Sequence, residues 1–323
     1  MKILVTRKIP EPGLRKLKNF NAQLTINQDD RNLNHEELNN LASDADAVLT
    51  MLADNIDADF LKSHPGLKIV ANYAVGFNNV DIQAATNNNV VVTNTPGVLT
   101  DTTADLAWSL LMAISRRVVE ADKYTRAGKF KGWAPELLFG SDIYGKTLGI
   151  IGAGRIGQAT ARRAAGFDMK VLYHSRSQKE DFEKETGALK VSLDNLLKES
   201  DFVSLHVPLT DETHHMIDAD DLKLMKNNTF LINTARGPVV NEKILARALQ
   251  EKWIAGAALD VFEEEPKVHP QLLDLDNVIL TPHIGSATDQ TRNKMAEMAA
   301  ESIIAVLSGQ KPENVVNSEI YEK

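Results

Sequence analysis

The glycine triplet at Gly152, Gly154 and Gly157 constrains this chain more than any other feature of its sequence. An apolar run at 148–151 precedes it, a helical pattern follows, and a second apolar run lies at 171–173. Strand, glycine turn, helix and strand within about thirty residues form the unit that a dinucleotide fingerprint requires. The glycines then allow a tight turn, close approach of backbone to pyrophosphate, and close helix–strand packing. We therefore predict that the phosphates of a dinucleotide bind at the N-terminus of this helix.

The composition narrows the class of protein. The 323 residues, 43% of them hydrophobic, suffice for one large core or two domains. A formal net charge of −8 argues against nucleic acid or an anionic membrane surface as the main partner. No apolar run approaches the roughly twenty residues of a membrane span, and the first ten residues lack a signal-peptide core. The chain has no cysteine, which excludes disulfides and thiolate catalysis. We expect a cytoplasmic protein without a metal site.

The first hundred residues alternate short apolar runs with helical patterns. The runs lie at 3–6, 24–26, 47–51, 67–73 and 90–93, with helices near 11–19, 36–42, 57–62 and 81–88. This alternation predicts a parallel sheet covered by helices. One long helix should follow from about Asp101 to Ala127, with Val118 on its apolar stripe and Gly128 at its end.

The alternation begins again at Thr147. Six candidate strands lie at 148–151, 171–173, 202–207, 230–233, 257–261 and 278–280. Six strands built from two mononucleotide-binding halves make a dinucleotide-binding domain. We predict a helix that starts at Ser192 and a second long helix at about 288–307. The fold class is therefore α/β, with two doubly wound parallel-sheet domains.

A second phosphate-binding pattern is present and is rejected. Residues 140–147, GSDIYGKT, match GxxxxGK[ST], the phosphate loop of nucleoside triphosphatases. That loop needs a strand before it and a helix after it. Here a strand should follow at once, so we predict no such site.

The segment after the second strand indicates the type of dinucleotide. An NAD site places Asp or Glu about twenty residues after the glycines, where it binds the ribose 2′-hydroxyl. This chain has Ser175 and Arg176 in that segment, within YHSRS, and no carboxylate. Arginine with neighbouring hydroxyls binds a 2′-phosphate through charge-assisted hydrogen bonds. We favour NADP(H), and the alternative is an ordinary basic loop that also accepts NAD(H).

Three polar residues each lie just beyond a candidate strand, namely Arg236, Glu265 and His283. Ligands bind outside the carboxyl ends of parallel strands, so these side chains can converge on one site. A guanidinium clamps a carboxylate, a histidine transfers a proton, and a nearby carboxylate favours its charged form. The alternatives are an arginine that caps a turn, a glutamate in an acidic surface run, and a structural histidine after proline.

Seven segments of this sequence resemble the D-isomer-specific 2-hydroxyacid dehydrogenase family over essentially the whole chain. They are NYAVGFNNVDI, TPGVLTDTTADLAWSLL, GKTLGIIGAGRIGQ, HVPLTDETHHMI, FLINTARGPVV, GAALDVFEEEP and TPHIGSAT. The chain is most similar to glyoxylate/hydroxypyruvate reductases and related 2-ketogluconate reductases. The resemblance implies a Rossmann dinucleotide-binding domain at 101–286, inserted into a flavodoxin-like substrate domain of 1–100 and 287–323.

The resemblance also implies roles for individual residues. Arg236 would hold the substrate carboxylate and carbonyl, Glu265 would pair with the catalytic histidine, and His283 would donate the proton. The backbone of Val75 and Gly76 would make the other carboxylate contact. The cofactor contacts that it implies are Thr103 and Asp260 near the nicotinamide, Arg155 and Ile156 at the pyrophosphate, His206, Val207, Pro208 and Thr213 on the adenosine side, and Thr234, Ala235 and Gly285 in the rest of the crevice.

The implied reaction is NAD(P)H-dependent reduction of a small 2-oxo acid to the D-2-hydroxy acid. Alternatives are 2-ketogluconate reduction, another D-2-hydroxyacid dehydrogenase, and a corepressor-like protein that binds NAD(P)H as a sensor. Relatives form homodimers through the region of the long helix and of Phe130–Phe139, so we expect a homodimer. Trp133 in that segment either reaches the partner's substrate site or lies in the core of the interface.

Overall fold

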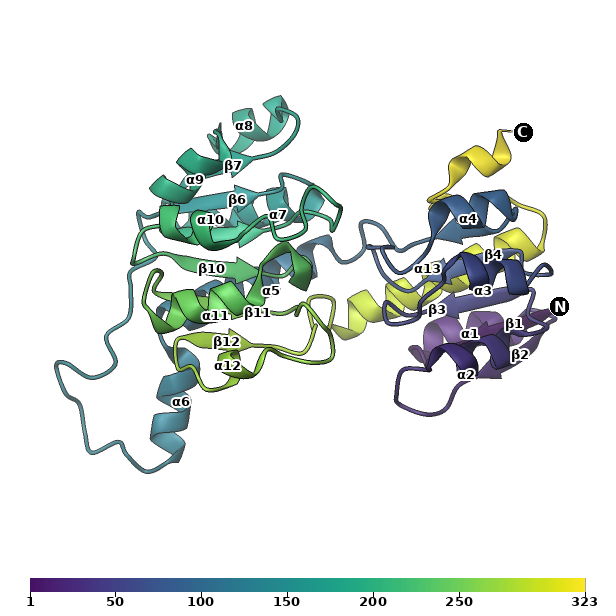
Figure 1. Cartoon of the computed structure of the whole chain (residues 1–323), viewed down its shortest axis with the longest axis horizontal. Coiled ribbons are helices and arrows are strands. Elements are labelled where there is room, and N and C mark those ends of the chain that lie inside the picture. The colour runs from purple at the N-terminus through teal and green to yellow at the C-terminus, as the bar shows by residue number, and fades with distance from the viewer. Residues whose placement is uncertain (323) are drawn as a thin grey trace. The chain divides into compact units, whose positions relative to one another are not determined.

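The computed structural model describes residues 1–322 and divides into two compact α/β units (Figure 1). The discontinuous unit comprises Met1–Leu99 and the segment from Ser286 onward, and the central unit is Thr100–Gly285. Each boundary lies one residue before the position expected from the sequence. Each unit contains one parallel sheet with helices on both faces, which confirms the predicted fold class.

The discontinuous unit is built on a five-stranded parallel sheet in the order β2-β1-β3-β4-β5. Its strands are β1 (Lys2–Val5), β2 (Gln23–Ile26), β3 (Ala47–Thr50), β4 (Ile69–Asn72) and β5 (Val91–Thr93). Its helices are α1 (Glu11–Asn19), α2 (His35–Ala42), α3 (Ala58–Ser63), α4 (Ile82–Asn87), α13 (Asp289–Leu307) and the 3₁₀ helix η3 (Ser318–Tyr321). This strand order is that of flavodoxin-like sheets, in which ligands bind beyond the carboxyl ends of the strands.

Alternate residues of these strands enter two separate cores. Helices α2, α3 and α4 cover one face, where Leu38 and Phe60 pack on Leu4 and Val70. Helices α1 and α13 cover the other face. Gly13 lets these two helices approach closely, because a Cβ atom at this position would lie 2.5 Å from the carbonyl oxygen of Ala296.

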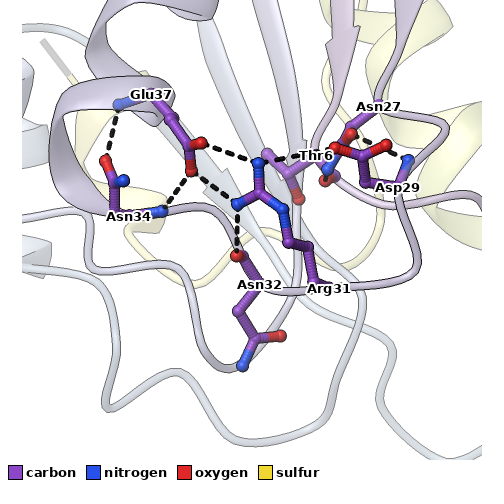
Figure 2. Close-up of polar contacts among 7 residues, drawn as sticks. All are labelled: Thr6, Asn27, Asp29, Arg31, Asn32, Asn34 and Glu37. Carbon is purple, nitrogen blue, oxygen red and sulfur yellow. Dashed lines mark hydrogen bonds and ion pairs between the residues drawn. The ribbon is translucent and has the colours of Figure 1, made fainter.

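The loop between β2 and α2 is held by charged side chains (Figure 2). Asn34 and Glu37 form a capping box at the start of α2, which satisfies two backbone N–H groups reciprocally. Arg31 donates to both carboxylate oxygens of Glu37 at 2.7 Å. The hydrogen bonds from Arg31 and from the Asn34 backbone lower the pKa of Glu37 from 4.5 to about 2.

The central unit is built on a seven-stranded parallel sheet in the order β12-β11-β10-β9-β6-β7-β8. Its strands are β6 (Thr147–Ile151), β7 (Lys170–His174), β8 (Leu189–Lys190), β9 (Phe202–Leu205), β10 (Phe230–Asn233), β11 (Gly256–Leu259) and β12 (Val278–Leu280). Its helices are α5 (Thr100–Ser115), α6 (Val118–Arg126), α7 (Arg155–Arg163), α8 (Glu180–Thr186), α9 (Leu193–Glu199), α10 (Ala219–Leu224), α11 (Glu242–Gln250) and α12 (Pro270–Leu273), with 3₁₀ helices η1 (Ala164–Phe167) and η2 (Gly237–Val239).

The chain order reverses at β6, the strand that leads into the glycine turn. The strands on its two sides reproduce the dinucleotide-binding order 3-2-1-4-5-6, extended by one strand at the β12 edge. Helices α5 and α7 pack on one face of this sheet, where Trp108 donates to the backbone oxygen of Thr160 at 2.7 Å. Helices α9 to α12 cover the other face.

The expectation of one long helix from 101 to 127 is wrong. Helix α5 ends at Ser115 and α6 begins at Val118, with Arg117 between them in the left-handed region at φ 52°. The Ser115 hydroxyl bonds back to Leu111 of the preceding turn, and its backbone oxygen accepts from the N–H of Ser141 instead of continuing the helix. Val118 is also 52% exposed and does not belong to the expected apolar stripe.

The sheet of the central unit also has one strand more than expected. The two exposed residues of β8 pair with β7 and were not recognised as a strand because they lack an apolar run. Ser192 caps α9, and Thr288 caps α13, close to the predicted starts. Residues 140–146 lead directly into the strand β6, as predicted, whereas a phosphate loop leads into a helix. Among the described residues, every helix is too short or too polar to span a membrane.

Candidate active site

Each of the three glycines in the turn after β6 has a different structural role. Gly152 adopts φ +97°, and a Cβ atom on it would lie 2.6 Å from the carbonyl oxygen of His206. A Cβ atom on Gly157 would lie 2.1 Å from the carbonyl oxygen of Gly152. In contrast, no described atom beyond its own helix and chain neighbours lies within 4 Å of a Cβ placed on Gly154. Packing therefore explains the first and third glycines, while the second leaves open space at the start of α7.

The open start of α7 and a buried hydroxyl beyond β10 fit a dinucleotide. Gly154 is the N-cap of α7 and has no side chain to bond the N–H groups of the first turn. Those N–H groups carry partial positive charge and suit a phosphate. Arg155 is exposed and Ile156 is half-buried in the same turn. The hydroxyl of Thr234, beyond β10, is buried and has no partner within the described chain.

Residues 206–213 form a segment beyond β9 that is held by hydrogen bonds. The N–H of His206 bonds the carbonyl of Ile151, and its Nε2 lies 2.9 Å from the Ser204 hydroxyl. Burial lowers the pKa of His206 to about 3, so the imidazole is neutral. Thr213 donates to the carbonyl of Pro208 at 2.6 Å, which closes the loop. The predicted adenosine-side residues thus lie in one short segment, with Val207 against Gly152.

The segment beyond β7 carries one exposed cation. Ser175 is half-buried and Arg176 is exposed. Within residues 1–322 the guanidinium of Arg176 makes no hydrogen bond or ion pair. The carboxylate of Glu183, which follows in the sequence, accepts from the hydroxyl of Tyr173 at 2.6 Å and not from Arg176. Arg176 is therefore available to an anion.

Glu265 and His283 form a direct pair, although they come from separate loops. Nδ1 of His283 lies 2.9 Å from Oε2 of Glu265, and their side chains are 33% and 37% exposed. The other carboxylate oxygen of Glu265 accepts from the N–H of Phe262 at 3.1 Å. His283 adopts φ 53°, an uncommon conformation for a residue other than glycine, and such conformations cluster at functional sites.

Arg236 lies close enough to Glu265 for the two charges to interact. Its Nη1 donates to the carbonyl of Ala235 at 2.7 Å, and its own carbonyl accepts from Asn233 at 3.0 Å. Burial lowers the pKa of Arg236, and the charge of Glu265 opposes this shift. The guanidinium stays charged because the ordinary arginine value lies far above neutrality. A half-buried cation beside an ion pair is suited to a carboxylate ligand.

Asp260 holds the turn that carries His283. It accepts from the Thr281 hydroxyl at 2.6 Å and from two backbone N–H groups of the following turn, including that of Gly285, at 2.8 Å. Burial raises the pKa of Asp260, while these donors oppose the shift. Thr103 of α5 donates to the carbonyl of Gly285 at 3.1 Å. The two residues predicted to lie near the nicotinamide therefore also fix the backbone beside His283.

Sequence reasoning missed a second histidine–glutamate pair next to this site. Nε2 of His215 lies 2.6 Å from Oε1 of Glu263, in the same acidic run as Glu265. The other carboxylate oxygen of Glu263 accepts from the N–H of Glu242 at the start of α11. This pair ties the loop of Glu265 to two neighbouring segments. The sequence has two adjacent histidines, 214–215, and three adjacent glutamates, 263–265, and it does not indicate which histidine pairs with which glutamate.

The discontinuous unit contains the remaining predicted contact, the loop of Val75 and Gly76 beyond β4. Both residues are half-buried. The carbonyl of Val75 accepts from the side chain of Asn94 at 2.7 Å, and that of Gly76 accepts from Asn72 at 2.7 Å. Neither asparagine was predicted as a site residue. The only sequence signal was their place at the ends of two strands.

Comparison with known proteins gives a consistent result over the whole chain. Residues 108–285 match the family model "D-isomer specific 2-hydroxyacid dehydrogenase, NAD binding domain". The chain is 53% identical to a glyoxylate reductase of Thermococcus onnurineus, over 99% of this chain and 96% of that protein.

Solved structures with the same fold contain either nicotinamide cofactor. An NADPH-dependent glyoxylate/hydroxypyruvate reductase of Sinorhizobium meliloti, with NADP and malonate bound, is 34% identical with a TM-score of 0.85, covering 98% of this chain and 96% of that one. A D-lactate dehydrogenase of Aquifex aeolicus, with NAD and lactic acid bound, is 30% identical with a TM-score of 0.85, covering 98% and 99%.

Proposed function

We propose a specific 2-oxo acid reductase activity for this chain, which belongs to the D-isomer specific 2-hydroxyacid dehydrogenase family. The protein is accordingly an NAD(P)-dependent oxidoreductase. The proposed reaction is reduction of a small 2-oxo acid of the glyoxylate or hydroxypyruvate type to the D-2-hydroxy acid. The observation that supports it most strongly is the Glu265–His283 pair, with the cation of Arg236 beside it.

His283 is the proposed proton donor. Because Nδ1 faces Glu265, the opposite ring nitrogen, Nε2, is the one that can reach a substrate oxygen. The carboxylate of Glu265 holds the ring in this orientation. Proton transfer from Nε2 to the carbonyl oxygen then prevents an alkoxide from accumulating.

Arg236 is the proposed clamp for the substrate carboxylate, and the N–H groups of Val75 and Gly76 are a second contact for it. Two donors that hold the carboxylate fix the orientation of the neighbouring carbonyl. The guanidinium also stabilises negative charge that develops on the carbonyl oxygen. The domain that contains Val75 is proposed as the substrate domain, and the central unit as the dinucleotide-binding domain.

The reduced nicotinamide dinucleotide supplies the hydride in this reaction. We propose that the N-terminus of α7, with Arg155 and Ile156, holds its pyrophosphate. The remaining proposed contacts are Gly152, Gly154, Gly157, His206, Val207, Pro208, Thr213, Thr234, Ala235, Thr103, Asp260 and Gly285. Arg176 is exposed, lies next to Ser175 and has no partner among residues 1–322, and these features favour NADPH over NADH.

We also propose that the protein acts as a homodimer. No residue of α6 is buried, although Val118 and Val119 are apolar. The following segment exposes Phe130, Phe139 and Trp133, the last to 86%. Large exposed apolar side chains that gather in one region are typical of an interaction surface.

A spectrophotometric assay tests the proposed reaction. Glyoxylate, hydroxypyruvate, 2-ketogluconate and pyruvate are each supplied with NADH and with NADPH, and oxidation of the cofactor is followed. We expect the highest kcat/KM with glyoxylate or hydroxypyruvate and NADPH. Highest activity with 2-ketogluconate would support that alternative, and binding without oxidation of either cofactor would support the sensor.

The variant His283→Ala tests the assignment of the proton donor. Loss of a general acid lowers kcat by about 10² to 10⁴ fold, while cofactor binding should be retained. The matched control is His214→Ala, which removes an exposed histidine of the same unit. Unchanged turnover in His283→Ala would exclude the proposed role.

A further inference from the structure

Three consecutive peptide groups beyond β4 have their carbonyl oxygens held by hydrogen bonds. The carbonyl of Ala74 accepts from the N–H of Thr95 at 2.8 Å. The carbonyl of Val75 accepts from Nδ2 of Asn94 at 2.7 Å, and that of Gly76 from Nδ2 of Asn72 at 2.7 Å. Two of these three donors are side chains, so the identity of two residues fixes the orientation of the loop.

The N–H groups of the same three peptides therefore point away from these donors. In a trans peptide the N–H of one residue is antiparallel to the carbonyl of the residue before it. Anchoring of the Val75 carbonyl by Asn94 thus directs the N–H of Gly76 to the opposite side. Anchoring of the Gly76 carbonyl by Asn72 does the same for the N–H of Phe77.

None of these three N–H groups is used within the part of the chain that the structure describes. Across residues 1–322, no hydrogen bond has the N–H of Val75, Gly76 or Phe77 as its donor. Successive backbone N–H groups that are unused in a turn can bind an anion. This loop is partly exposed, and its unused N–H groups are oriented before an anion binds.

The orientation of Asn72 is itself fixed by its neighbours. Its Oδ1 accepts from the Thr50 hydroxyl at 3.1 Å and from Nδ2 of Asn79 at 3.2 Å. Because Oδ1 is occupied, Nδ2 faces the carbonyl of Gly76. Asn79 also donates to the carbonyls of Met51 and Asp54, which links this loop to the loop beyond β3.

The backbone of Asn94 is fixed independently of Asn72. Its carbonyl accepts from the side chain of Asn314, whose Oδ1 accepts from the Ser302 hydroxyl of α13 at 2.9 Å. The two anchors of the loop therefore depend on different parts of the unit. A substitution at one of them leaves the supports of the other intact.

We propose that Asn94 and Asn72 are positioning residues that turn the N–H groups of Gly76 and Phe77 toward the carboxylate of the 2-oxo acid. Phe77 thereby becomes a third backbone donor beside Val75 and Gly76. This inference rests on the proposed function, since it assigns the anion to the substrate of that reaction. An aliphatic side chain at either asparagine would leave a carbonyl unsatisfied and the peptide free to rotate.

Steady-state kinetics of Asn94→Leu and Asn72→Leu test this role. We expect KM for glyoxylate to rise about tenfold, the value of one hydrogen bond to a charged group, with kcat within a factor of about three. Kd for NADPH should not change. The matched control is Asn27→Leu, which removes an asparagine of this unit that is half-buried like Asn94 and donates to a backbone carbonyl, that of Thr6 at 3.0 Å. A KM in Asn94→Leu no higher than that of the control would overturn the proposal.

An NMR measurement tests the same idea without turnover. Val75–Gly76 is the only Val–Gly pair in the sequence, so ¹³C′-valine with ¹⁵N-glycine labels the single amide of Gly76. Oxalate, a carboxylate that cannot be reduced, is titrated into the full-length protein with NADPH present. We expect the Gly76 amide proton to move downfield in the wild type, and Asn94→Leu to weaken the apparent Kd for oxalate about tenfold.

The two measurements separate failure of this inference from failure of the proposed function. A Gly76 amide of the wild type that does not respond to saturating oxalate would overturn the role of the loop, whatever the kinetics. If the amide responds but the wild type reduces no 2-oxo acid, the proposed reaction fails and the anion-binding loop stands. If Asn94→Leu does not fold, Asn94→Ala takes its place, and the wild-type titration remains decisive.

Discussion

His283 and Glu265 are joined at 2.9 Å, although 18 residues separate them in the sequence. Partial burial raises the pKa of Glu265, but the hydrogen bond and charge of His283 outweigh this effect, with smaller contributions from Phe262 and Arg236. The pKa of Glu265 therefore lies below its ordinary value of 4.5. The carboxylate form contributes to stability above pH 4.5, and this contribution is lost as pH falls through the lowered native pKa.

The variant Glu265→Gln removes the charge of this residue and keeps its shape, so it should show what the charge contributes to catalysis. Glutamine can still accept from His283 but carries no charge. We expect kcat for reduction to fall about ten- to a hundredfold, with Kd for NADPH unchanged. Glu264→Gln, an exposed neighbour in the same acidic run, is the control. A kcat in Glu265→Gln equal to that of Glu264→Gln would contradict the proposed pairing.

The close contact of Gly237 with the backbone of Phe262 should make the site sensitive to a single methyl group. A Cβ atom on Gly237 would lie 1.8 Å from the carbonyl carbon of Phe262, so the two loops must separate. Because Gly237 follows Arg236 and Phe262 precedes Glu265 by three residues, Gly237→Ala should displace both. We expect a loss of at least about 2 kcal/mol of unfolding free energy, measured by denaturant titration, and a lower kcat.

Gly166→Ala provides the matched control for that substitution. Gly166 lies in the same unit, and no described atom beyond its chain neighbours and its own helix lies within 4 Å of a Cβ placed there. The control should have an unfolding free energy within about 1 kcal/mol of the wild type. Equal stability of the two variants would mean that the loops can separate without cost.

The sequence was sufficient to predict the fold class because strands and glycines leave local patterns. Apolar runs marked most strands, and the three glycines marked the turn after β6. Arg236, Glu265 and His283 could be singled out because each lies just beyond a strand. Their mutual geometry could not be predicted, since it depends on loops whose conformation is set by contacts such as that of Gly237 with Phe262.

The errors have equally specific causes. The break between α5 and α6 falls within an apolar–basic stretch that continues the helical period, and only the backbone contacts of Ser115 reveal it. Asn72 and Asn94 were not recognised because an asparagine at a strand end is typical of any turn. Their role depends on which carbonyl each of them reaches, and this is a property of the folded sheet.

The loop before α2 gives a prediction of pKa that does not depend on function (Figure 2). Arg31→Ala should raise the pKa of Glu37 from about 2 toward 4.5, because the bidentate hydrogen bond is lost. The contribution of this pair to stability is present above pH 4.5 and is lost as pH falls toward 2. NMR titration of the Glu37 carboxyl carbon measures the shift. Arg7→Ala, which breaks an ion pair to Asp30 in the same loop, should leave it unchanged.

The exposed face of α6 predicts how the proposed dimer can be disrupted. Val119→Glu places a charge on a helix that has no buried residue, so the fold of the monomer should tolerate it. Burial of that charge in an interface would be costly, and we expect dissociation at micromolar concentration in sedimentation velocity experiments. Lys123→Glu on the same helix is the control for a change of charge. A monomeric wild type would contradict the dimer itself.

Arg176 provides the most direct test of cofactor preference. Since its guanidinium has no partner in the described chain, its removal should cost little stability. Arg176→Ala should raise KM for NADPH about tenfold or more and leave KM for NADH within about twofold, because only NADPH carries the 2′-phosphate. Arg176→Asp should reverse the preference, since a carboxylate repels that phosphate and accepts from the 2′-hydroxyl of NADH. Lys179→Ala, a few residues further along, controls for a general loss of positive charge. Equal KM ratios in the wild type and in Arg176→Ala would mean that this loop does not select the cofactor.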